Sequence, residues 1–354
     1  MRRTLLSLCL LSIVSTSALA QPAWTPASSG TSAELRGLSV VSTSVAWASG
    51  ARGTVLRTTD GAQWQAMSVA GAEKLDFRDI HAIDANTALV MGAGPGDASR
   101  IMRTDDGGKT WRQVALNSYK EGFWDSMAFW DAGNGIVFGD PVDGKFQVYV
   151  TADGGATWRE VQATGLESLK DEGAFAASGT ALTVHGARDV WIATGGASSA
   201  RVLRSADRGL TWRAASLPIP AAAPGKGIFS VGFLDAQHGM AVGGDYKQPL
   251  LDSVNGARTI DGGASWQPVS VQPTGYMSVV MAVPGAPRAL VAGGLAGSGY
   301  SVDGGQNWKV LDRTPVNTIG FASPAIGWAV GPKGLLMKYS GPSLGAAVKQ
   351  ARRY

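Results

Sequence analysis

The sequence predicts an all-β protein built from repeated units of short strands. A motif, S/T-x-D-x-G-x-x-W, occurs five times along the 354 residues and a sixth time one residue short. Its closing Trp residues recur at intervals of 42 to 54 residues, which is the self-similarity expected of a repeat architecture. The composition agrees, because 48 Gly and only 16% charged residues suit short strands and tight turns better than helices.

Each copy of the motif is interpreted as a tight turn between two strands. In such a turn the Asp carboxylate accepts hydrogen bonds from backbone N–H groups, and the Gly residues supply positive φ angles. The Ser or Thr hydroxyl adds local hydrogen bonds, and the closing Trp offers an apolar face for packing between units. One carboxylate repeated at every unit is therefore expected to be structural. The residues concerned are Asp60, Asp106, Asp153, Asp207, Asp261 and Asp303.

A second signature sets the number of units. A strand–turn–strand pattern such as residues 129–137 occurs seven times, against six motifs. The seventh unit, residues 327–340, stops before its Trp strand, whereas Trp24 stands alone before the first unit. We expect Trp24–Ser28 to supply the missing outer strand. The sequence thus predicts a seven-bladed β-propeller of four-stranded blades over residues 21–342, with the ring closed by an N-terminal strand.

Residues 1–20 have the features of a secretory signal peptide. Arg2 and Arg3 form a charged start, an apolar core follows that is too short to span a bilayer, and Ala18-Leu19-Ala20 is a small-x-small cleavage site. Cleavage near Ala20 would place the mature protein in the periplasm or outside the cell. Cys9, the only Cys, lies in this segment, so we expect no disulfide in the mature chain.

Charge and motif content exclude several function classes. Removal of Arg2 and Arg3 lowers the formal net charge from +4 to +2, which is too small to indicate nucleic-acid or membrane-surface binding. The tail, residues 343–354, is basic. The three His residues are widely separated, and no Gly-rich loop opens a helix, so no metal and no cofactor are expected. We expect a monomer without a transmembrane segment.

The loops opposite the motif turns carry the candidate site. The motif turns join the third and fourth strands of each blade, whereas the longest polar loops belong to the other face, and function often lies on such loops. We expect them to surround the mouth of the central funnel, with Asp125 and Asp140 as the strongest pair. For each residue singly, a turn-forming or solvated loop role remains open. The candidate binding residues are Arg78, Asp79, Tyr119, Trp124, Asp125, Asp140, Asp143, Lys145, Glu172, Asp245 and Tyr246.

The repeats resemble a known family. The pattern R-T-x-D-G-G-x-T-W, preceded by D-x-x-x-G-(W/I/M)-x-x-G, resembles the Asp-box or BNR repeat of β-propellers and is most similar to the Ycf48 family. It is seen in Arg103–Trp111 with Asp131–Gly139, and in Arg258–Trp266 with Asp235–Gly243. The resemblance implies an exported, non-enzymatic scaffold that binds a protein client. Members of that family help to assemble photosystem II, but nothing in this chain indicates a photosynthetic host.

The alternative is an enzyme that acts on glycans. Asp-boxes also occur in sialidases and other glycosidases, and two carboxylates flanking a glycosidic bond can hydrolyse it. A sialidase is disfavoured, because the chain has no Arg-Ile-Pro segment near its start and no motif fixes a catalytic Tyr. Another hydrolase or lyase that uses the acidic loops stays open. The expected partner is therefore an exported or membrane protein client, or a glycan.

Overall fold

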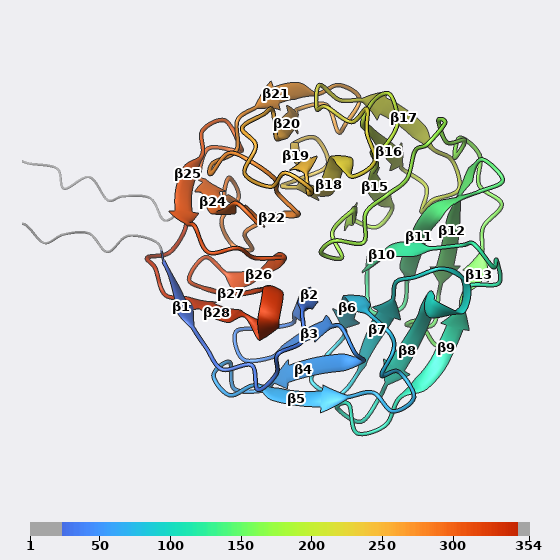
Figure 1. Ribbon diagram of the computed structural model, residues 1–354, viewed down its shortest axis with the longest axis vertical. Helices are drawn as coiled ribbons and strands as arrows, with labels where there is room; N and C mark the ends of the chain where they lie inside the picture. Colours follow the sequence, from blue (N-terminus) through green and yellow to red (C-terminus); the bar gives the residue numbers. More distant parts are fainter. Residues whose placement is uncertain (1–22, 346–354) are drawn as a thin grey trace, which may run out of the picture.

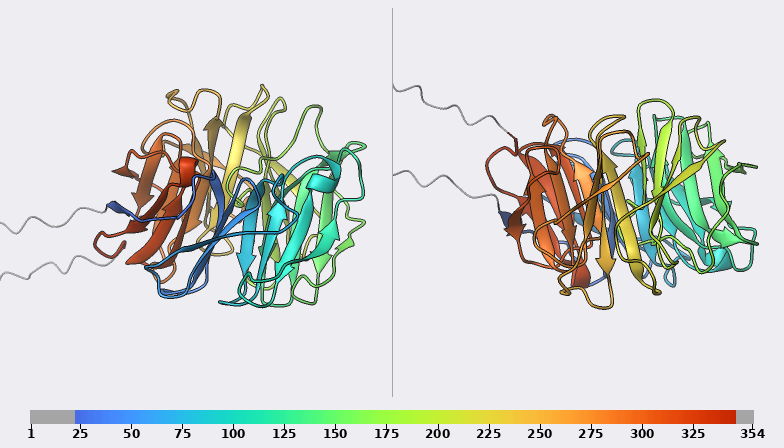
Figure 2. Two further views of the ribbon diagram at one scale, coloured as in Figure 1. Left: turned by 60° about the horizontal axis from the view of Figure 1, so that its bottom comes forward. Right: turned by 90° about the horizontal axis from the view of Figure 1, so that it is seen from above.

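A computed structural model describes residues 23–345, which form a ring of seven four-stranded antiparallel sheets (Figure 1). In the side views the strands run through the thickness of the ring, and loops gather on its two faces (Figure 2). The predicted seven-bladed β-propeller is confirmed. The expected signal peptide, residues 1–20, and the end of the basic tail, residues 346–354, lie outside the described residues.

The first six blades each use four strands that are consecutive in the chain. Blades one to three contain β2 (Leu35–Val40), β3 (Ala46–Gly50), β4 (Thr54–Thr58), β5 (Gln65–Ser68), β6 (Phe77–Ala82), β7 (Ala88–Gly92), β8 (Arg100–Thr104), β9 (Arg112–Leu116), β10 (Trp124–Phe129), β11 (Gly135–Val142), β12 (Lys145–Thr151) and β13 (Arg159–Glu160). Blades four to six contain β14 (Leu182–His185), β15 (Asp189–Ala193), β16 (Arg201–Ser205), β17 (Arg213–Ser216), β18 (Lys226–Phe233), β19 (Gly239–Asp245), β20 (Gly256–Thr259), β21 (Gln267–Val269), β22 (Val279–Ala282), β23 (Leu290–Gly294), β24 (Gly297–Ser301) and β25 (Lys309–Asp312).

The seventh blade joins the two ends of the chain. It contains β26 (Thr318–Ser323), β27 (Ile326–Val330), β28 (Leu336–Tyr339) and β1 (Trp24–Pro26). Strand β1 pairs antiparallel with β28 and forms the outer edge of the blade (Figure 1). The buried Trp24 ring packs 5.8 Å from Phe321 and 5.6 Å from Tyr339, between centroids. The prediction that an N-terminal strand closes the ring is confirmed.

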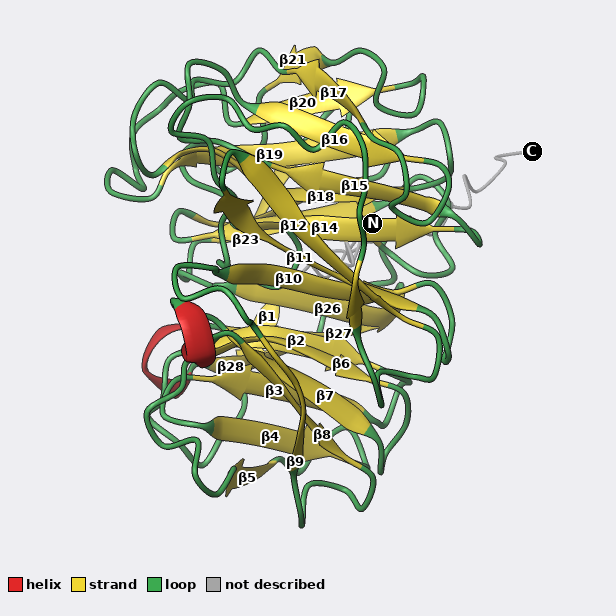
Figure 3. Ribbon diagram, turned by 90° about the vertical axis from the view of Figure 1, so that its right-hand side faces the viewer, coloured by secondary structure: helices red, strands yellow, loops and turns green. Residues whose placement is uncertain are grey.

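The core lies between neighbouring blades. The second strands are the most enclosed, and every residue of β3, β7 and β23 is buried. One cluster joins Phe138 and Phe146 of blade three to Ile192 of blade four. Within residues 23–345 the only helical segments are the short turns η1 (Gly96–Ala98) and η2 (Pro332–Gly334), so none has the length or apolar character of a membrane span (Figure 3).

The Asp-box turns hold themselves together through their own carboxylates. In blade five, Asp261 accepts hydrogen bonds from the Thr259 hydroxyl at 2.7 Å and from the Ser265 amide at 3.0 Å. Hydrogen bonds from Ser265, led by its hydroxyl, lower the pKa of Asp261 to about 2. Gly262 and Gly263 adopt φ values of 72° and 92°, which side chains disfavour. All six boxes lie on one face of the ring, between the third and fourth strands of their blades.

Candidate functional site

A recurring β-bulge shapes the channel end opposite the Asp-boxes. In blades one, two, three and five, the innermost strand slips its register near its start, so one residue has no partner on the second strand. A bulge bends the strand and redirects a side chain. The unpaired residues are Arg36, Arg78, Asp125 and Phe229. All four line one central pocket.

This central pocket has a volume of about 410 Å³ and receives residues from all seven blades. One wall is aromatic. Phe175 and Phe229 stack with ring centroids 3.9 Å apart, and Tyr276 meets Phe229 edge-on at 4.7 Å. Tyr246 stands at the rim and is 47% exposed. The wall therefore offers an apolar surface whose exposed edge carries the phenol of Tyr246.

The facing wall carries charges of both signs. Arg36 pairs with Glu34 at 2.7 Å, and Arg78 pairs with Asp76 at 2.8 Å. Arg78 also donates to the Ala176 carbonyl at 3.4 Å. A ligand in this pocket would thus meet guanidinium donors and carboxylate acceptors on one side and aromatic rings on the other.

Asp125 and Asp140 meet in this wall, on neighbouring strands of blade three. Both carboxyl oxygens of Asp125 are buried and receive no hydrogen bond of good geometry among residues 23–345, although the amides of Asp140 and Ala176 lie near enough to lower its pKa slightly. Burial, reinforced by the Asp140 charge, raises the pKa of Asp125 well above its usual range, although Arg78 opposes the shift. Asp140 accepts a hydrogen bond from the Ala174 amide at 2.8 Å, and burial raises its pKa to about 6. Asp125 therefore favours the protonated acid, and Asp140 is the carboxyl that ionises first.

Seven of the residues predicted for the funnel mouth do not line the pocket. Trp124 is buried and packs edge-on against Tyr149 at 5.1 Å. Asp79 is buried and accepts the amides of Ile80 at 2.7 Å and Met127 at 2.6 Å, which joins blades two and three. Burial raises the pKa of Asp79 to about 7.

Two more of these seven, Glu172 and Asp245, are held in ion pairs. The Glu172 side chain is fully buried, and it accepts a hydrogen bond from the Nε of Arg201 at 2.8 Å. Asp245 faces Lys226 at 3.4 Å across β19 and β18. These contacts give both carboxylates a role within the propeller loops rather than in the central pocket.

Tyr119, Asp143 and Lys145 line a separate pocket of about 210 Å³ on blade three. There the Tyr119 hydroxyl donates to Glu160 at 3.2 Å. Of the predicted residues, the structure therefore brings four into the central pocket: Arg78, Asp125, Asp140 and Tyr246.

Sequence reasoning missed most of the pocket, because only four of its sixteen lining residues were predicted. The missed residues that carry its character are Glu34, Arg36, Phe175, Phe229, Tyr276 and Asn317. A signal for two of them was present, because each bulged residue sits between an apolar residue and a small or acidic one. Leu35-Arg36-Gly37 matches Phe77-Arg78-Asp79 and Ile228-Phe229-Ser230 in this respect.

Within residues 23–345, no group of three or more His, Cys, Asp or Glu side chains is placed to hold a metal ion. His81 stacks on Phe129 with centroids 4.2 Å apart, and burial lowers its pKa to about 4. His238 contacts Asp235 at 2.9 Å in a turn.

Comparison with known proteins identifies the kind of propeller. Residues 16–164 match the model of the photosynthesis system II assembly factor YCF48 family. The chain is a Ycf48-like Asp-box propeller. No curated protein sequence matches it.

Solved structures share the fold of this Ycf48-like propeller at low identity. A YCF48 bound to D1 peptide is 18% identical with a TM-score of 0.65, and the match covers 93% of this chain and 100% of that one. YCF48 from Cyanidioschyzon merolae is 20% identical with a TM-score of 0.64, covering 90% and 99%. A GH74 xyloglucanase from Xanthomonas campestris is 16% identical with a TM-score of 0.65, covering 93% of this chain but only 55% of the enzyme.

Proposed function

We propose that this Ycf48-like propeller is an exported, non-enzymatic binding or assembly scaffold that holds a protein client on its pocket-bearing face. The observation that carries the proposal is an apolar loop at residues 246–254. Four of its side chains are exposed: Tyr246 (47%), Leu250 (76%), Leu251 (46%) and Val254 (41%). Large apolar residues gathered on one surface mark interaction sites rather than ordinary solvent-facing loops.

The loop and the central pocket form a continuous surface. The Tyr276 amide donates to the Pro249 carbonyl at 2.9 Å, which fixes the loop beside the aromatic wall. Tyr246 belongs to both features. A polypeptide segment suits such a surface, because apolar side chains can enter the aromatic half while polar groups meet Arg36 and Arg78. The YCF48 structure with a bound D1 peptide supports a protein client as the class of partner.

Export rests on the signal-like features of residues 1–20. The client would then be another exported protein or the exposed part of a membrane protein. Crosslinking from the pocket-bearing face would identify this client.

The glycan-acting alternative depends on the Asp125–Asp140 pair and on the GH74 likeness. A glycosidase needs one carboxyl to protonate the leaving oxygen and another to act as base or nucleophile. Both oxygens of Asp125 are buried, which obstructs direct contact with a sugar and favours the scaffold. The chain also spans about half of the xyloglucanase, so the enzyme's activity does not transfer by likeness.

A site-specific photo-crosslinker tests the proposal. A benzophenone amino acid replaces Tyr246 in one variant and Val302 in the other, in cells that export the full chain. The two positions are matched in exposure, at 47% and 44%, but Val302 lies on an Asp-box turn of the opposite face. We expect a discrete crosslinked client at Tyr246 and none at Val302.

A panel of chromogenic glycosides completes the test. We expect no turnover by the wild-type protein. Turnover that disappears in Asp140→Asn would replace the scaffold by the hydrolase. Equal crosslinking from both positions would refute the assignment of the client to the pocket-bearing face.

A further inference from the structure

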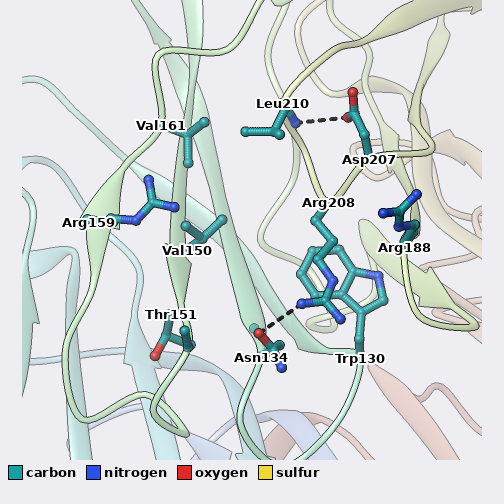
Figure 4. Close-up of a pocket in the computed structure, with 12 residues that line it drawn as sticks. Trp130, Asn134, Val150, Thr151, Arg159, Val161, Arg188, Asp207, Arg208 and Leu210 are labelled. Carbon is teal, nitrogen blue, oxygen red and sulfur yellow. Dashed lines mark hydrogen bonds between the residues drawn. The ribbon is translucent and has the colours of Figure 1, made fainter.

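A second cavity lies on the Asp-box face, between blades three and four (Figure 4). Its volume is about 660 Å³. It is separate from the central pocket and shares no lining residue with it. Three arginines from three segments surround it: Arg159, Arg188 and Arg208.

The cavity exists because blade three departs from the repeat. The residue before the Ser or Thr is Arg in four of the six Asp-boxes, and Lys338 holds the equivalent strand position in blade seven. In blades one, two and seven this cation donates to a carbonyl of the next blade. Arg57 donates to the Ala85 carbonyl at 2.9 Å, and Lys338 donates to the Gly61 carbonyl at 2.8 Å. In blade three the position is Val150, which is too short to cross to blade four. The corresponding cations are Arg57, Arg103, Arg204, Arg258 and Lys338, and blade six has Tyr300.

Blade four departs from the repeat at the same interface. The residue directly after the Asp of the box is Gly in the other five boxes. In blade four it is Arg208, whose φ is 62°. A residue with a side chain is strained in this left-handed conformation. Such strain persists where the surroundings hold it, and it often marks a functional position.

The guanidinium of Arg208 is held at the cavity by the surrounding loops. It donates to the Asn134 side-chain oxygen at 3.0 Å and to the Ala187 carbonyl at 2.8 Å, and it lies 5.9 Å from the Trp130 ring centroid (Figure 4). Its approach to the exposed Asp131 is long, at 4.0 Å.

The remaining two arginines have no such contacts. Within residues 23–345, the guanidinium groups of Arg159 and Arg188 form no hydrogen bond and no ion pair. The one acid in the cavity wall, Asp207, accepts hydrogen bonds from Ser205 at 2.7 Å and from Leu210 at 3.0 Å within its own turn. The cavity is therefore positively charged.

Apolar groups line the rest of the cavity. Val150 and Val161 come from blade three, and Leu210 from the Asp-box of blade four is 52% exposed. Leu210 occupies the box position that Lys109 holds in blade two. An exposed Leu beside three arginines combines an apolar contact with unused charge-assisted donors.

We propose that this cavity binds an organic oxyanion, a carboxylate or a phosphate monoester carried on a flat apolar body. Arg188 and Arg208, on one side of the cavity, hold the anionic group, because guanidinium forks match the oxygens of carboxylate and phosphate, and Arg159 adds positive charge from the opposite side (Figure 4). Trp130, Val161 and Leu210 cover the apolar body. The volume falls within the usual range for small-molecule sites.

Titration calorimetry with defined probes tests this proposal. The probes are 2-naphthoate and 2-naphthyl phosphate, with methyl 2-naphthoate and 2-naphthylmethylamine as neutral and cationic controls of similar shape. We expect saturable binding of at least one anion and weaker or no binding of both controls. Comparison of the two anions identifies whether the site prefers carboxylate or phosphate.

Three variants assign the binding to the cavity. Arg188→Gln should weaken anion binding about tenfold or more, because a hydrogen bond to a charged group contributes about 1.5–3 kcal/mol. Arg213→Gln is the matched control, since Arg213 holds the strand position of Arg159 one blade later and does not line the cavity. Val150→Arg restores the residue of the other blades and should abolish binding by filling the cavity, while the thermal midpoint is unchanged or raised.

The proposal fails if neither anion binds, or if methyl 2-naphthoate binds as tightly as 2-naphthoate. It also fails if Arg213→Gln weakens binding as much as Arg188→Gln. Unchanged binding by a folded Val150→Arg protein would place the ligand elsewhere.

Discussion

Replacement of Asp140 by Asn should stabilise the protein at neutral pH and leave it nearly unchanged in acid. The Asp140 carboxyl is largely buried, and one of its oxygens accepts the Ala174 amide at 2.8 Å. Asn can keep this hydrogen bond through its carbonyl oxygen, and it cannot ionise. The substitution therefore removes a buried charge without removing the hydrogen bond to Ala174.

The size of the effect follows from the pKa. Burial raises the pKa of Asp140 from 3.8 to about 6, so the folded protein holds the proton more tightly than the unfolded chain. The cost of ionisation in the fold is absent below about pH 3.8, grows through this window and is complete above about pH 6. The folded and unfolded pKa values of Asp140 differ by about two units. Ionisation of Asp140 therefore lowers the free energy of unfolding by about 3 kcal/mol at about pH 7.5 and by about 1 kcal/mol at about pH 4.5.

Urea denaturation at the two pH values measures this difference. We expect Asp140→Asn to raise the free energy of unfolding by about 2–3 kcal/mol at about pH 7.5 and by about 1 kcal/mol at about pH 4.5. The matched control is Asp143→Asn, in the exposed turn of the same hairpin, which should change it by less than about 0.5 kcal/mol. An equal gain at both pH values would refute the assignment of the raised pKa to Asp140, and so would a loss at pH 7.5.

Three further changes probe the propeller itself. Asp261→Ala removes an acceptor of three hydrogen bonds within one turn and should lower the free energy of unfolding by about 1–2 kcal/mol, whereas Lys309→Ala, an exposed strand residue, should not. Glu172→Gln leaves the Arg201 cation without its buried counter-charge and should lower the free energy of unfolding, measured by urea denaturation, by about 3–5 kcal/mol. A loss below about 1 kcal/mol would show that the ion pair contributes little to stability. Trp24→Ala removes the packing of the closing strand on Phe321 and Tyr339 and should cost about 3–5 kcal/mol, seen as a lower thermal midpoint; an unchanged midpoint would mean that closure by β1 adds no stability.

The fold was predictable because the blades repeat the same turn and packing residues at regular intervals. The Asp, Gly and Trp of the boxes fix the turn between the third and fourth strands, and their spacing counts the blades. The unpaired Trp24 and the incomplete seventh unit indicated the closing strand. The first inference uses contacts within about fifty residues, which a sequence displays directly, whereas the second joins the two ends of the chain and follows from the count of the units.

The pocket was only partly predictable, because sequence gives the face of a residue but not its distance from the axis. Arg78 and Asp125 reach the axis because a bulge redirects them at the start of an innermost strand. Glu172 belongs to a loop on the same face, yet Arg201 holds it within blade four. Phe175 and Tyr276 lie in irregular connections before an innermost strand, and no repeated pattern indicates which of their residues face the axis.

Both proposed sites arise where the chain departs from its own repeat. Six copies of one turn give an internal standard, so a substitution that costs energy in one copy alone calls for an explanation. Arg208 accepts left-handed backbone strain where other boxes use Gly, and Val150 gives up a cation that crosses to the next blade in three others. At the opposite end of blade three, Asp125 remains buried and receives no hydrogen bond of good geometry among residues 23–345. Val150, Arg208 and Asp125 lie in and beside one blade, so the two proposed sites occupy opposite ends of the part of the ring that departs most from the repeat.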